Sequence, residues 1–125
     1  MIKAIISTVA VFIILICGAV TEQILIAKEF DYIRGEVVAV KNLVEEKTVK
    51  NTDMDALIDM WHGKKSWLQN FIPHNDVRDI DPNLALCKSY IATGEYNMAL
   101  ARLQFIIEIF TALPKSYKIS IENIF

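Results

Sequence analysis

The sequence has little of the residues that break or cross-link a chain: four glycines, three prolines and two cysteines among 125 residues. So little glycine and proline excludes collagen-like repeats, linkers and extended disorder. Two cysteines make no disulfide framework, and we expect Cys17 and Cys87 to be chemically quiet thiols. The net charge is only −2, from 13 basic and 15 acidic residues. This balance argues against a nucleic-acid partner, because nucleic-acid surfaces need a basic excess.

Motifs that carry enzymatic chemistry are also missing. His62 and His74 lie near the acidic segment 76–81, but no His-x-x-x-His pair occurs. That segment also lacks the glycine and the distal glutamate of a calcium loop. There is no glycine-rich phosphate loop, and Cys87 has no histidine close in sequence. We therefore predict a protein that is not an enzyme and has no catalytic residue, cofactor or metal ion.

What the sequence has in excess is hydrophobicity, with 54% hydrophobic residues and a mean hydropathy of +0.34. No residue from Ala4 to Val20 is charged, and as a helix this run spans about 25 Å, close to the ~30 Å hydrocarbon core of a bilayer. We predict a transmembrane anchor over residues 1–27, with Lys3 snorkelling to the interface. The alternative is a cleaved signal peptide, which the long apolar run disfavours. A lipid-modified cysteine is disfavoured by the bulky Ile16 before it.

The orientation follows less directly from the residues. A short N-terminal tail before a single hydrophobic helix usually stays in the cytoplasm. Lys28 and Arg34 on the other side of the helix slightly oppose this assignment, because only Lys3 precedes it. We expect a single-pass protein of the cell membrane with the bulk of the chain outside the cytoplasm.

The segment after the anchor carries one apolar stripe with alternating steps of four and three residues, which is typical of a helix. The anchor is expected to run straight into it. Lys47 and Lys50 suit the C-terminal end of this helix, and Asn51 can take the left-handed conformation that ends it. Thr52 and Asp55 predict a capping box that begins the next helix. The stripe consists of Ile26, Phe30, Ile33, Val37, Val40 and Val44.

Three further helices are indicated by apolar periodicity and by start and stop residues. The second is stopped by Pro73. The third begins at Asp81 and Pro82, with the aspartate as N-cap, and closes at Gly94. The fourth runs from Glu95 to about Ala112 before Pro114. Its apolar face, the most buried that we predict, carries Ala99, Leu103, Ile106, Phe110 and Leu113.

No strand pair with hairpin turn chemistry occurs, so we predict an all-α fold. The transmembrane helix continues into a small antiparallel helical bundle over residues 28–113, followed by a tail over 114–125 that docks on the bundle. The turn around Gly94, with Tyr90 and Ala99, is similar to a tetratricopeptide hairpin. We find a single copy, whereas repeat proteins need about three.

Two groups of apolar residues are candidates for binding a partner. Trp61, Trp67 and Phe71 share one helix at helical spacing; such aromatics are usually core, and the alternative is a docking groove. Ile124 and Phe125 form an apolar chain end, which either packs back on the bundle or contacts a partner.

Several features of the sequence occur together: the anchor, Trp61 and Trp67 followed by Phe71-Ile72-Pro73-His74, Tyr90 with Ala99, and the ending Ile119-Ser120-Ile121-Glu122-Asn123-Ile124-Phe125. This arrangement resembles a known family of small membrane proteins, domain-of-unknown-function family 4363. Ile121 stands where leucine is usual in the tail of that family. The resemblance implies a single-pass envelope protein of spore-forming Gram-positive bacteria, without assigned activity and often encoded beside another integral membrane protein.

We predict a non-enzymatic, membrane-anchored helical interaction module that is accessory to another integral membrane protein. Its expected partners are the lipid bilayer, that membrane protein and a second copy of itself. This function predicts a filled core and an exposed apolar patch. The alternative is a sensor that binds a small molecule or lipid between the helices, which predicts an internal cavity bordered by His62 or His74.

Overall fold

The computed structural model of the chain describes the backbone of residues 1–124 and the side chains of residues 1–115. Over these residues the fold is all-α and has no strand, as predicted. The helices are α1 (Ile2–Glu45), α2 (Asn51–Leu68), α3 (His74–Val77), α4 (Ile80–Ala92) and α5 (Tyr96–Ile124).

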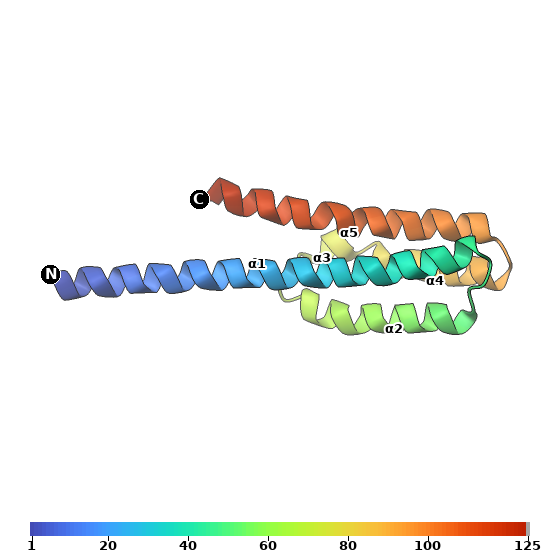
Figure 1. Cartoon of the computed structure of the whole chain (residues 1–125), viewed down its shortest axis with the longest axis horizontal. Coiled ribbons are helices and arrows are strands. Elements are labelled where there is room, and N and C mark those ends of the chain that lie inside the picture. Colours follow the sequence, from blue (N-terminus) through green and yellow to red (C-terminus); the bar gives the residue numbers. More distant parts are fainter. Residues whose placement is uncertain (125) are drawn as a thin grey trace.

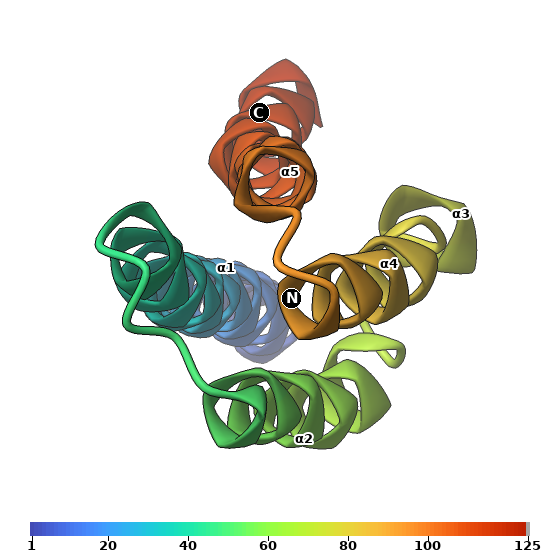
Figure 2. The same ribbon diagram turned by 90° about the vertical axis from the view of Figure 1, so that its right-hand side faces the viewer.

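The four longer helices form an antiparallel bundle. They run alternately up and down along one axis (Figure 1), and the end-on view places them around a common core (Figure 2). The helices α1 and α4 each pack against both α2 and α5, so every neighbouring pair is antiparallel. The short α3 lies outside this ring, in the connection between α2 and α4.

The first helix is unbroken over 44 residues, a length of about 66 Å at 1.5 Å per residue. Its N-terminal half projects beyond the bundle (Figure 1), and none of its most apolar window is buried. Its C-terminal half buries all six residues of the predicted stripe, from Ile26 to Val44. The predicted continuity of the apolar N-terminal helix with the bundle is confirmed.

Aromatic rings from three helices meet in the middle of the core. The ring centroid of Phe110 on α5 lies 5.9 Å from that of Phe30 on α1 and 5.6 Å from that of Trp61 on α2. The Trp61 contact is edge-to-face, an arrangement that aromatic quadrupoles favour. All three side chains are almost completely buried. This cluster therefore ties α1, α2 and α5 together.

The boundary between α1 and α2 differs from the prediction. Lys47, not Asn51, takes the left-handed conformation, with φ of 58°. The Lys47 N–H donates to the Val44 carbonyl, which closes α1 directly after the last buried residue of its stripe. Asn51 is already helical, and the capping bond runs from the Lys50 N–H to Asp53 Oδ2 at 2.8 Å, in place of the expected box at Thr52. The helix α1 therefore ends where its buried stripe ends, and not at the residue that was expected to stop it.

The boundary between α2 and α4 also differs. The helix α2 ends at Leu68, five residues before Pro73, because the buried Ile72 turns back toward it and donates its N–H to the Leu68 carbonyl at 2.9 Å. The helix α4 begins at Ile80, with Asp79 as its N-cap residue. Asp81 is therefore not the cap, and its carboxylate contacts α2 instead.

The turn between α4 and α5 forms as predicted. Gly94 has φ of +75°, and its N–H donates to the Ile91 carbonyl. The Glu95 N–H donates to the Tyr90 carbonyl at 2.8 Å, which completes a Schellman motif. The two helices then pack antiparallel. The likeness of this pair to a tetratricopeptide hairpin stays a prediction.

The predicted end of the last helix at Pro114 is wrong. The helix α5 contains this proline and continues to Ile124. Proline removes one backbone hydrogen bond, but its fixed φ near −65° is compatible with a helix, so the chain can continue at a cost. The expected separate tail 114–125 is therefore, up to Ile124, a continuation of α5. Docking of Ile124 and Phe125 on the bundle concerns side chains outside the described residues.

Candidate functional site at the junction of anchor and bundle

The predicted aromatic face divides into a buried part and an exposed part. Trp61 is only 1% exposed and belongs to the core, so it is not a surface contact. Trp67 and Phe71 are 36% and 38% exposed, and their ring centroids are 4.8 Å apart. These two form an exposed aromatic pair. The last two candidates, Ile124 and Phe125, lie outside the described side chains.

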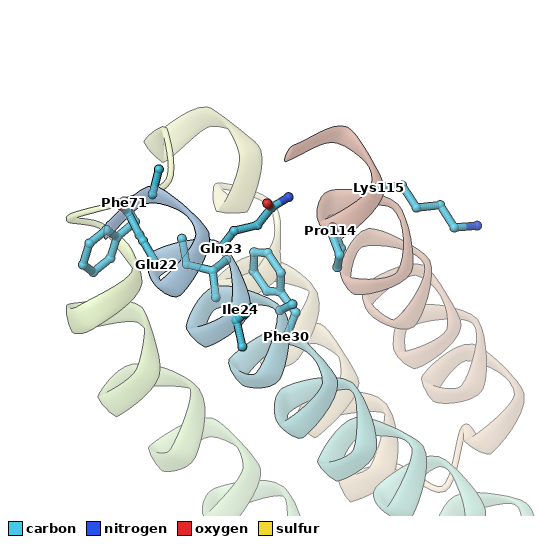
Figure 3. A pocket seen from close by; sticks show the side chains of 10 residues that line it. Glu22, Gln23, Ile24, Phe30, Phe71, Pro114 and Lys115 are labelled. Atoms are coloured by element: carbon cyan, nitrogen blue, oxygen red, sulfur yellow. The ribbon is translucent and has the colours of Figure 1, made fainter. Parts of the chain in front are cut away.

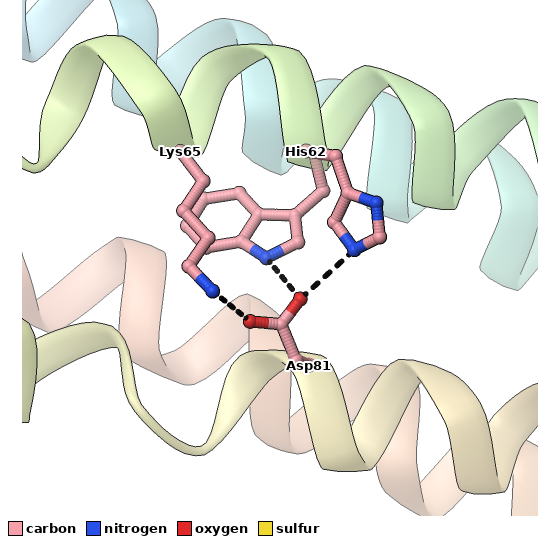
Figure 4. Close-up of polar contacts among 4 residues, drawn as sticks. His62, Lys65 and Asp81 are labelled. Atoms are coloured by element: carbon pink, nitrogen blue, oxygen red, sulfur yellow. Dashed lines mark hydrogen bonds and ion pairs between the residues drawn. The ribbon is translucent and has the colours of Figure 1, made fainter.

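The Trp61 indole is fixed by a polar cluster between α2 and α4, drawn in Figure 4. Its N–H donates to Asp81 Oδ1 at 3.1 Å, and His62 Nε2 lies 3.2 Å from the same oxygen. Lys65 Nζ lies 2.6 Å from Asp81 Oδ2. One carboxylate therefore binds three groups of α2. Such a cluster joins the two helices and satisfies the one polar atom of a buried tryptophan.

The electrostatics of this cluster favour the ionised carboxylate. Burial on its own raises the pKa of the Asp81 carboxyl. The hydrogen bond and charge of Lys65, with smaller contributions from Trp61 and His62, outweigh burial and hold the pKa below its usual value. The sequence held a signal for this site, because positions 61, 62 and 65 share one helix face. Because the sequence predicts Asp81 as a helix N-cap, it does not predict the contact of this carboxylate with α2.

An apolar groove lies where α1 leaves the bundle. We call it the juxtamembrane groove (Figure 3); it has a volume of about 450 Å³ and is open to the surface. Its walls come from α1, from the connection after α2 and from α5, which diverges from α1 at this end (Figure 1). The residues that line it are Ala19, Glu22, Gln23, Ile24, Ile26, Ala27, Phe30, Phe71, Pro114 and Lys115.

The core contains a second, smaller gap. Among the side chains of residues 1–115, this gap lies between core residues such as Ile33, Trp61 and Phe110 and has no room for a water molecule. Neither this gap nor the groove borders His62 or His74, so the internal cavity expected for a sensor is not supported. Sequence reasoning missed the groove because it depends on the divergence of two helices far apart in the chain.

The exposed aromatic pair adjoins the juxtamembrane groove. Phe71 forms part of its wall, on the side of Glu22 in Figure 3, and Trp67 packs against Phe71 with its ring tilted by 48°. The end of α2 is held against α1 by Lys64, whose ammonium lies 2.7 Å from Glu29 Oε2 and 4.9 Å from the Tyr32 ring centroid. An apolar groove and an exposed aromatic pair thus share the anchor end of the bundle.

The remaining reactive groups do not converge on this site. Burial raises the pKa of the Cys87 thiol to about 12, and its Sγ contacts Met54 Sδ in the core. Cys17 is exposed on the projecting part of α1. Within residues 1–115 no group of three or more histidine, cysteine or acidic side chains is placed to hold a metal ion. The site offers apolar contact and a few rim charges.

Comparison with known proteins places the chain in a family. No curated protein and no solved structure matches it. The family described as "Domain of unknown function (DUF4363)" matches residues 23–124. This range begins within α1, about one helical turn before the bundle, and extends to the end of α5. The apolar run that precedes residue 23 lies outside the matched region. The chain belongs to the DUF4363 family of unknown function.

Proposed function

We propose that the chain is a non-enzymatic interaction module anchored in the cell membrane. The observation that carries this proposal is the division of α1 into two halves. The first is apolar, uncharged between Ala4 and Val20 and unburied, and the second is a fully packed wall of the bundle. An unburied apolar helix of this length needs a hydrocarbon environment, because exposing it to water costs free energy for every side chain.

The proposed module is accessory to another integral membrane protein, and the anchor end of the bundle is its contact region. Support comes from Trp67 and Phe71, which remain exposed although they are large apolar side chains. Trp67 lies in the last turn of α2 and Phe71 three residues after its end, and this end of α2 is the one nearest the projecting half of α1. A membrane protein that packs beside the anchor meets this surface first.

Affinity capture from native membranes tests the partner. The full chain is compared with Trp67→Ala and with Phe105→Ala, a matched control that removes a 42% exposed aromatic from α5. We expect the same integral membrane protein to co-purify with wild type and with the control, and its yield to fall with Trp67→Ala. A deletion of Phe125 tests the chain end in the same way. Equal yields from all forms would contradict a contact at either place.

Anchoring and sidedness need a separate measurement. The proposed topology places the bundle outside the cytoplasm with an uncleaved anchor. A Cys17→Ser protein with Asn75→Cys carries one exposed thiol, because Cys87 is buried. We expect a membrane-impermeant maleimide to label it in intact cells, and its mass to include residues 1–20. Labelling only after lysis would show that the bundle lies in the cytoplasm. A mass without residues 1–20 would show that this segment is a cleaved signal peptide.

A further inference from the structure

The height of the aromatic pair above the membrane follows from the register between α1 and α2. The ion pair of Lys64 with Glu29 aligns the two helices at that level. Trp67 is three residues closer to the anchor along the antiparallel α2, about 4.5 Å, which brings it to the level of residues 25–26 of α1. Phe71 lies lower still, beside Glu22 in the groove wall.

The level of Phe71 falls within the lipid headgroup layer, and the level of Trp67 lies at its outer edge. If the hydrocarbon boundary is at Val20, where the uncharged run ends, Glu22 lies about 3 Å above it and residues 25–26 lie about 7.5–9 Å above it. The headgroup layer is about 5–7 Å thick on each side of a bilayer. Aromatic side chains concentrate in this layer, because one environment solvates both their apolar and their polar surfaces. Phe71 therefore lies at the depth that such residues favour, and Trp67, which contacts it, lies at the outer edge of this layer.

The juxtamembrane groove opens at the same depth. Ala19, its lowest residue on α1, lies within the uncharged run, and the groove continues upward to the buried Phe30. Its floor is therefore continuous with the lipid-facing surface of the proposed anchor. Its lining is apolar apart from Glu22, Gln23 and Lys115, and the Lys115 side chain points away from the groove in Figure 3. The volume of about 450 Å³ is in the range of ligand sites.

We propose that the juxtamembrane groove is a phospholipid-binding site. One acyl chain of a phospholipid from the surrounding bilayer rises from the level of Ala19 along the groove to Ala27, and Phe71 with Trp67 closes the α2 side. Burying the apolar walls against an acyl chain removes them from water at the place where the bundle meets the bilayer. This proposal rests on the membrane anchor proposed above.

The two tryptophans make the first test possible. The full chain is reconstituted in phosphatidylcholine vesicles whose acyl chains carry bromine, a quencher of tryptophan fluorescence, near either the headgroup or the methyl end. We expect bromine near the headgroup to quench more strongly, and Trp67→Phe to lose most of this quenching, because the remaining Trp61 is 1% exposed. Equal quenching of both proteins, or stronger quenching from the methyl end, would overturn the placement.

Flotation of the same vesicles after an alkaline wash separates this proposal from the anchor. Protein that floats with the lipid but shows no Trp67 quenching refutes the lipid site and leaves the anchor intact. Protein that is washed off refutes the anchor, and with it the lipid site.

Filling the groove is the second test. A phosphatidylcholine with a photoactivatable acyl chain is irradiated with the reconstituted protein, and lipid adducts are mapped by mass spectrometry. We expect an adduct on the peptide containing Phe71 in wild type and in Ala39→Phe, a control at an exposed position of α1, and its loss in Ala27→Phe. Ala19→Phe, on the projecting part of α1, fills the groove without entering the core. An adduct that persists in both filled variants, or the absence of an adduct on this peptide in wild type, would overturn the proposal.

Discussion

Replacing Phe110 by alanine should remove a large part of the stability of the bundle. The Phe110 ring is 1% exposed and contacts Phe30 and Trp61 on two other helices. Truncation of a buried phenylalanine costs about 3–5 kcal/mol through lost transfer free energy and the cavity that remains. We expect a value in the upper part of this range, because other core contacts hold α1 and α2 in place. The two helices therefore cannot both move into the cavity that the ring leaves. The whole free energy of unfolding of a domain of this size is about 5–15 kcal/mol.

The assay is chemical denaturation of the full chain in detergent micelles, followed by near-ultraviolet circular dichroism, to which the Trp61 environment contributes. The matched control is Phe105→Ala, which truncates the same residue type five positions earlier on α5, where the side chain is 42% exposed. The control should change the free energy of unfolding by less than about 1 kcal/mol. A similar loss from both substitutions, or a loss below about 1 kcal/mol for Phe110→Ala, would refute the core assignment.

The other predictions concern single groups. The Asp81 pKa is lower in the folded chain, so its carboxylate stabilises the fold above its ordinary pKa of 3.8, and this contribution is lost as the pH falls through the folded pKa. Denaturation midpoints should therefore fall less on acidification in Asp81→Asn than in wild type. In a Cys17→Ser protein, Cys87 should resist maleimide until the chain is denatured, because its thiol pKa is about 12; rapid labelling of folded protein, seen by mass, would contradict its burial. Gly94→Ala should destabilise the fold by about 1–2 kcal/mol, because φ at this position is +75°. Gly63→Ala should stabilise the fold by about 0.5–1 kcal/mol, because Gly63 lies inside α2 with open space around it. Melting temperatures that shift in the same direction for both variants would refute this contrast.

The helices and their buried faces were predictable because each depends on local periodicity. The stripe from Ile26 to Val44 and the face from Ala99 to Phe110 repeat at the helical period, and every member is buried except the last predicted one, Leu113, which is partly buried. Gly94 was predictable because a positive φ favours one residue type.

The errors fall where tertiary contacts decide between local alternatives. Asp81 has the sequence of an N-cap but binds the side chains of α2, which lie twenty or fewer positions away. Pro114 is a helix breaker by composition, yet α5 continues through it. The candidate site was predicted only in part. Trp67 and Phe71 were chosen together with the buried Trp61, because apolar spacing alone does not show which side of a helix a neighbour covers.

The absence of a joint between the projecting half of α1 and its packed half has a mechanical consequence. A helix of 44 residues without a proline or a break transmits tilt and rotation along its whole length. Turning the apolar half by one residue position, about 100° around the axis, would carry Phe30 out of the core. In the proposed membrane setting, the bundle can therefore rotate about the membrane normal only together with the first half of α1, and the packing of residues 1–20 would set the face that the bundle offers to neighbours.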